Sequence, residues 1–260
     1  MNKIHTQLEV IKKSGKIGLM THVIVGFPSQ EETKTLIQVL ADGGSDFIEL
    51  QIPFSDPIAD GSVIMKASDI ALKNGVTVKD AMKMMKEMSR AVAVPLLFMC
   101  YYNTVFHYGL EKFCKEAAQS GASGLIIPDV PPEEEQYEHI IEIAQQHSLL
   151  LIRVVSPASS VVRLQKNAES AEGFVYCVSR FGVTGTKDGL DVRLSDYLER
   201  VKTIVKLPRA VGFGISQASQ VHALEKNAEI AVVGSAVIEM VLAKKSYSSI
   251  RDFVKSLKSI

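Results

Sequence analysis

The segment Phe47-Ile-Glu-Leu-Gln-Ile-Pro-Phe-Ser-Asp-Pro-Ile-Ala-Asp-Gly61 decides the fold, because it contains one complete change from strand to helix. Its first residues are almost wholly apolar, which is typical of a buried parallel strand. Two prolines then stiffen a loop, a glycine lets the chain turn, and a helical pattern begins at Ser62. The segment is therefore a strand-loop-helix unit.

Similar units follow one another along the chain, with no Gly/Ser-rich linker or low-complexity tract between them. The predicted strands are Ile17–Val25, Asp46–Ile52, Val94–Cys100, Gly124–Ile127, Leu149–Val155, Gly173–Val178, Arg209–Gly212 and Ile230–Val233. The predicted helices are Glu31–Ala41, Ser62–Lys73, Glu111–Ser120, Pro132–Gln146, Ser160–Asn167, Leu194–Val205, Ser216–Lys226 and Ala236–Leu242, with extra helices at Asn2–Lys13, Val78–Arg90 and Ser248–Lys258. Eight such units favour a closed (β/α)8 barrel of the α/β class over an open doubly wound sheet.

Composition narrows the class of protein. A length of 260 residues suits a single barrel domain spanning 1–260. The 29 basic and 29 acidic side chains cancel, so nothing indicates nucleic acid or an anionic membrane as a partner. The longest apolar stretch, Ala91 to Tyr102, is too short to cross a bilayer, and the N-terminus lacks a secretory signal. We therefore expect a cytoplasmic protein whose three cysteines are reduced.

A barrel places its active site at the carboxyl ends of the strands. Glu49 lies within an apolar strand, and a carboxyl group buried there is a candidate acid or base for proton transfer. The alternative is a structural Glu that is hydrogen-bonded to backbone or paired with a cation. Asp56 and Asp60 lie on the stiffened loop, and Asp60 is equally a candidate cap for the next helix.

Three later loops complete the candidate site. Ser179–Gly189 contains three glycines in a long connection, which indicates either a lid or a disordered loop. The glycines of Gly212-Phe-Gly214-Ile-Ser216 and Gly234-Ser-Ala236 follow the last two strands, where barrels commonly bind phosphate, although they are also ordinary turn residues. No metal-binding motif is present, and no lysine lies within a strand to form a Schiff base.

Taken together, the loop from Glu49 to Gly61, Pro128-Asp-Val-Pro131, Ser179-Arg-Phe-Gly-Val-Thr-Gly185 and the two glycine turns resemble the tryptophan synthase alpha chain family in order and spacing across nearly the whole chain. The resemblance implies a retro-aldol cleavage of indole-3-glycerol phosphate to indole and glyceraldehyde 3-phosphate. It implies no cofactor and no metal in this chain.

The resemblance also implies a role for each site residue. Glu49 would shuttle protons, and Asp60 would accept the indole N–H. Tyr176 would position Glu49 or the glycerol chain, and Thr184 would hydrogen-bond Asp60 when the lid closes. The phosphate would lie on backbone amides, and the pocket would be lined by several side chains. These remaining positions are Gly185, Gly214, Gly234 and Ser235 for the phosphate and Tyr101, Asp129, Ile64, Phe213 and His22 for the pocket.

The family further implies a partner, a pyridoxal-phosphate beta chain in an alpha2-beta2 complex, which loop 53–60 would face. Two alternatives stay open: a stand-alone lyase that releases free indole, and a weakly active barrel that acts mainly as an allosteric subunit of a beta chain. The sequence departs from the usual family pattern at six positions. These are His22 in place of an aromatic residue, Ile24 for Thr, Phe27 for Asp, Gln51 for Gly, Ser62 for Pro and Met65 for Gln.

Overall fold

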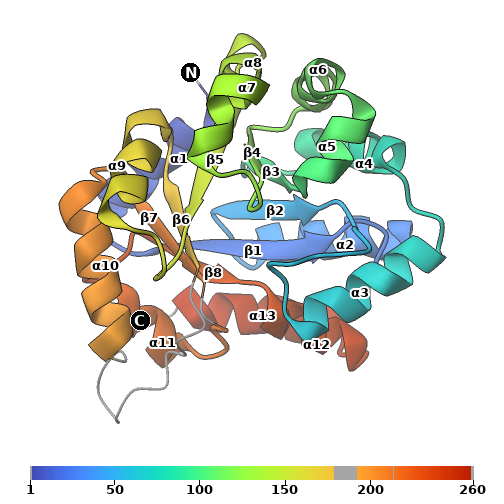
Figure 1. Ribbon diagram of the computed structural model, residues 1–260. Coiled ribbons are helices and arrows are strands. Elements are labelled where there is room, and N and C mark those ends of the chain that lie inside the picture. The colour runs from blue at the N-terminus through green and yellow to red at the C-terminus, as the bar shows by residue number, and fades with distance from the viewer. Residues whose placement is uncertain (1, 179–191, 213, 259–260) are drawn as a thin grey trace.

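The protein is described by a computed structural model over residues 2–178, 192–212 and 214–258 (Figure 1). Thr184, Gly185 and the rest of the predicted lid loop Ser179–Gly189 lie outside these residues, and so does Phe213.

Eight parallel strands close into a barrel in chain order, β1-β2-β3-β4-β5-β6-β7-β8, which confirms the predicted (β/α)8 fold. The strands are β1 Gly18–Ile24, β2 Phe47–Gln51, β3 Leu96–Met99, β4 Gly124–Ile126, β5 Leu150–Val155, β6 Val175–Val178, β7 Arg209–Gly212 and β8 Ile230–Val233. The first and last strands pair directly, so no described strand has a free edge.

Helices surround the barrel on its outside (Figure 1). They are α1 Lys3–Ser14, α2 Gln30–Asp42, α3 Ser62–Lys73, α4 Val78–Ala91, α5 Tyr102–Tyr108, α6 Leu110–Ser120, η1 Pro132–Glu134, α7 Glu135–Glu138, α8 Ile140–Gln146, α9 Val161–Ser170, α10 Val192–Ile204, α11 Ala218–Leu224, α12 Ser235–Leu242 and α13 Tyr247–Lys258. No described helix is both long enough and apolar enough to span a membrane.

One helix prediction was wrong, and one helix was not predicted. The pattern over 132–146 is not one helix: the chain breaks at His139, whose φ of 52° is left-handed, and η1, α7 and α8 result. The sequence also gave no expectation of α5. Its start is stabilised by the Asp129 carboxylate, which accepts a hydrogen bond from the Tyr102 N–H. That contact joins residues 27 positions apart in the chain, so local periodicity cannot reveal it.

The barrel interior and the layer under the helices are two separate apolar clusters. Side chains alternate between them because successive residues of a strand point to opposite faces. In β2, Phe47 belongs to the interior cluster, and Ile48 and Leu50 belong to the helix layer. Glu49 therefore points into the barrel with Phe47. Ile4 and Ile11 of α1 join the interior cluster, so α1 closes the amino end of the barrel.

Register brings the polar interior residues together. β1 pairs with β2 so that His22 lies opposite Glu49 and Ile24 opposite Gln51. Phe27 and Ile24, two of the departures from the family pattern, are buried in the helix-layer cluster. His22 and Gln51 are two further departures from the family pattern, and both are buried polar residues. His22 lies on β1, and Gln51 lies on β2 with Glu49.

Gly124 lies where β4 approaches β5 so closely that no side chain fits. A Cβ at this position would be 2.7 Å from the backbone oxygen of Leu150 and 3.0 Å from Cδ1 of Ile4. We expect Gly124→Ala to destabilise the protein by about 1–3 kcal/mol, as measured by urea denaturation, because backbone must shift. Gly61→Ala is the matched control: its Cβ meets nothing within 4 Å, so it should change stability by less than about 1 kcal/mol. Equal effects of the two substitutions would contradict the packing argument.

Candidate active site

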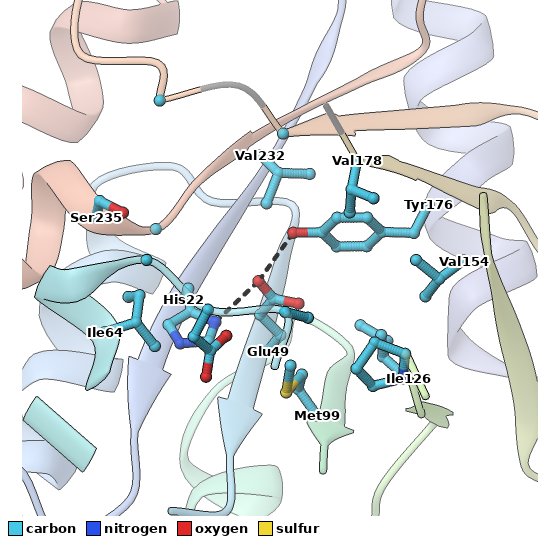
Figure 2. A pocket seen from close by; sticks show the side chains of 17 residues that line it. His22, Glu49, Ile64, Met99, Ile126, Val154, Tyr176, Val178, Val232 and Ser235 are labelled. Carbon is cyan, nitrogen blue, oxygen red and sulfur yellow. Dashed lines mark hydrogen bonds and ion pairs between the residues drawn. The ribbon is translucent and has the colours of Figure 1, made fainter. Parts of the chain in front are cut away.

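A cavity of about 210 Å³ lies at the carboxyl ends of the strands (Figure 2). Its floor and walls combine apolar side chains of five strands with a few polar groups. The lining residues are His22, Glu49, Ala59, Asp60, Gly61, Ile64, Met99, Ile126, Pro128, Val154, Tyr176, Val178, Gly212, Gly214, Val232, Gly234 and Ser235. A largely apolar pocket with a few convergent polar groups is the usual form of a small-molecule site.

Glu49 lines this cavity and is only 3% exposed. Its Oε1 is 2.9 Å from Nδ1 of His22 and accepts a hydrogen bond of 3.4 Å from the Tyr176 hydroxyl. Figure 2 shows both partners converging on that one oxygen. Oε2 of Glu49 has no hydrogen-bond partner among the described residues. One oxygen is therefore held by the protein, and the other has no protein partner among the described residues.

The surroundings of the buried His22 side chain favour its protonated, positively charged form. Burial acts against the cation, but the charge and hydrogen bond of Glu49, followed by the charge of Asp60 and the Gln51 amide, raise the pKa of His22 above its ordinary value. The structure thus brings together the two readings of Glu49 that the sequence left open. It is a cavity carboxylate, and it is also paired with a group that can carry positive charge.

Asp60 reaches the same cavity from the loop before α3. The Gln51 amide donates a hydrogen bond of 2.6 Å to its Oδ2. Partial burial raises the pKa of Asp60 above that of an exposed aspartate, although Gln51 and His22 oppose the shift. The N-cap of α3 is Gly61, with no side-chain capping bond. The alternative reading of Asp60 as a helix cap was therefore wrong.

Tyr101 and Asp129 are not among the residues that line this cavity. Tyr101 is buried behind the loop: its hydroxyl accepts a 3.1 Å hydrogen bond from the Ala59 N–H, and its ring stacks on Phe54. Asp129 accepts from the Tyr102 N–H at the start of α5. Tyr101 thus supports the loop that carries Asp60, and Asp129 supports α5.

The two glycine turns meet at the same cavity. Gly214, Gly234 and Ser235 all line it, and α12 begins at Ser235. No side chain caps that helix, so its first backbone N–H groups are available to a ligand. Such groups favour an anion. Gly214 has a left-handed φ of 70°, a conformation that glycine adopts without strain.

Sequence reasoning did not identify the partners of the two carboxylates. His22 was expected only as a pocket-lining residue, and Gln51 was noted only as a departure from the family pattern. The inward position of Gln51 could have been inferred from strand parity, because Gln51 is two residues after Glu49 and shares its face. Among the described residues, no group of three His, Cys, Asp or Glu side chains is arranged to hold a metal ion.

Comparison with known proteins gives one consistent result. The family described as "Tryptophan synthase alpha chain" matches residues 8–258. A protein of that name from Thermoanaerobacter sp. (strain X514) is 38% identical, with both chains covered completely. One from Desulfotalea psychrophila is 42% identical over 95% of this chain and 96% of its own.

Solved structures agree in fold and in family. The alpha subunit of tryptophan synthase from Legionella pneumophila str. Paris superposes with a TM-score of 0.90 at 32% identity, over 99% of this chain and 97% of its own. Since the family match spans almost the entire barrel and its close relatives align from end to end, this chain belongs to the tryptophan synthase alpha chain family.

Proposed function

We propose that this chain catalyses the reaction of its family, the retro-aldol cleavage of indole-3-glycerol phosphate to indole and glyceraldehyde 3-phosphate, with Glu49 and Asp60 as its catalytic residues. The observation that carries the proposal is that both carboxylates and both glycine turns line one cavity. The apolar walls suit an indole ring, and the amide-lined end suits a phosphate. A cytoplasmic location and a single domain over residues 1–260 belong to the same proposal.

Glu49 supplies the proton transfers. Glu49 lines the cavity and its Oε2 has no partner among the described residues, so we assign to Oε2 the delivery of a proton to C3 of the indole ring. It then takes the proton of the glycerol hydroxyl next to the breaking bond. The hydroxyl oxygen becomes the aldehyde carbonyl, and the electron pair of the broken carbon–carbon bond returns to the ring. One proton is donated and one is recovered, so the carboxyl group ends as it began.

Asp60 stabilises the ring during this exchange. Protonation at C3 places positive charge on the indole nitrogen, and a carboxylate that accepts the N–H lowers the energy of that state. Gln51 holds Asp60 in place from below. The phosphate binds to backbone N–H groups at Gly214, Gly234 and Ser235, and Ile64 contacts the substrate from α3. Tyr176 holds Glu49 through its hydroxyl.

The partner in this proposal is a tryptophan synthase beta chain, a pyridoxal-phosphate enzyme, in an alpha2-beta2 complex. The loop that precedes α3 is the proposed contact, and Ile58 at its tip is 78% exposed. An exposed apolar side chain beside the active site is consistent with a protein interface. The cofactor belongs to the partner, so this chain requires none.

The test is to incubate the purified chain with indole-3-glycerol phosphate and to measure indole, with and without a beta chain. We expect slow release by the chain alone and faster release with the partner. Equal rates would instead support a stand-alone lyase. No release by the isolated chain or by the complex would overturn the proposed cleavage, and would leave only the role of an allosteric subunit.

A further inference from the structure

Each carboxylate of the site contacts one buried polar side chain. His22 contacts Glu49, and Gln51 donates to Asp60. The remaining polar atoms of these two side chains, Nε2 of His22 and Oε1 of Gln51, have no hydrogen-bond partner among the described residues. One can be a donor and the other is an acceptor. Buried polar atoms without partners are costly, so a pair of them beside two carboxylates requires an explanation.

An imidazolium at position 22 provides that explanation. A charged His22 is a donor at both ring nitrogens, so Nδ1 donates to Glu49 while Nε2 also carries a hydrogen, and the Gln51 amide favours this charged form. A neutral ring makes only one of these donations. The protonated ring also offsets the repulsion between two acidic groups in one cavity.

We propose that His22 is a positioning residue that fixes Oε1 of Glu49 and shares with Glu49 the one proton that Glu49 delivers to the ring. The pair holds one proton, which rests on His22. In the reactive form His22 is neutral and Glu49 carries that proton on Oε2, from which it passes to C3 of the ring. The hydroxyl proton then goes to Oε2, which restores the single proton of the pair. The pair gains and loses one proton in each turnover. As a statement about catalysis, the inference rests on the proposed function.

The sign of the pH dependence follows from the environment of His22. The other titratable described groups that line its cavity are Glu49 from β2, Asp60 from the loop before α3 and Tyr176 from β6. Gly234, the N-cap of α12, lies next to His22 and is uncharged. Because the pKa of His22 is raised, the shared proton is present below that pKa and is lost as pH rises through it. We expect kcat/KM to fall over the same pH range, as pH rises through the pKa of His22.

The first measurement is the titration of the His22 ring by NMR. The chain has six histidines, so the signal is assigned by its loss in His22→Asn. We expect His22 to titrate above about 6.5, and Glu49→Gln to lower its proton affinity at least tenfold. Gln51→Leu should lower it less, because the Gln51 amide is the weakest of the supporting influences. The pairing is overturned if the His22 ring titrates below about 6.5, or if Glu49→Gln leaves its titration unchanged.

The second measurement is the pH profile of indole release by His22→Asn. The Asn amide can still donate to Glu49 but cannot ionise. We expect the falling limb of kcat/KM to move to lower pH, with at least a tenfold loss near pH 7 that is partly recovered at acid pH. The control is His5→Asn on the exposed face of α1, which should keep the original profile. A uniform loss at every pH would show a merely structural role and would overturn the proposal.

These two measurements distinguish a failure of the proposed function from a failure of the proposed role of His22. If the unsubstituted chain releases no indole, the proposed function fails, while the titration still decides whether His22 and Glu49 share a proton. If indole is released but neither the titration nor the profile depends on this pair, the proposed function stands and the inference about His22 fails.

Discussion

Glu49→Gln is expected to lower kcat for indole release by about 10³-fold, because the amide can neither deliver the proton to the ring nor remove the hydroxyl proton. The substitution preserves size, and the amide oxygen can still accept from Tyr176 and His22. The fold and the binding of phosphate should therefore be unchanged. The measurement is a steady-state assay with indole-3-glycerol phosphate, together with competitive inhibition by inorganic phosphate.

The matched control for this experiment is Glu169→Gln, which makes the same change at an exposed position on α9. It should retain full activity. If Glu49→Gln kept more than a tenth of the original kcat, Glu49 would not be the proton shuttle. The buried carboxyl would then serve only as the structural partner of His22.

Asp60→Asn is expected to lower kcat by about 10²–10³-fold, the usual effect of removing one group that stabilises developing charge. The Asn side chain removes the negative charge that faces the indole nitrogen but keeps an oxygen that accepts from Gln51. The inhibition constant of inorganic phosphate should change by less than about twofold, since the phosphate end of the cavity is formed by other elements. The measurements are kcat and that inhibition constant.

The control for Asp60 lies on the helix that follows it. Asp69 is exposed on α3, so Asp69→Asn should leave kcat and phosphate inhibition unchanged. A parallel loss of turnover and phosphate binding in Asp60→Asn would mean that the carboxylate organises the whole pocket. In that case its assigned role at the ring nitrogen would be wrong.

The sequence by itself determined the architecture of this protein. Strand and helix periodicities depend on residues close together in the chain, and a (β/α)8 barrel repeats them eight times. The positions of Glu49, Asp60 and the glycine turns also followed, because the fold places its active site at the carboxyl ends of the strands. The break in the helix at His139 was not predicted, since a single left-handed residue changes no hydrophobic pattern.

Only the tertiary structure decided what each polar group contacts. The register of β1 against β2 sets His22 opposite Glu49, and those residues are 27 positions apart. It is likewise the folded loop that puts Asp60 on the Gln51 amide instead of on the helix start. Hydrogen bonds and charge interactions act over a few ångströms of space. Their partners are therefore fixed by barrel closure and strand register, which no local pattern of residues specifies.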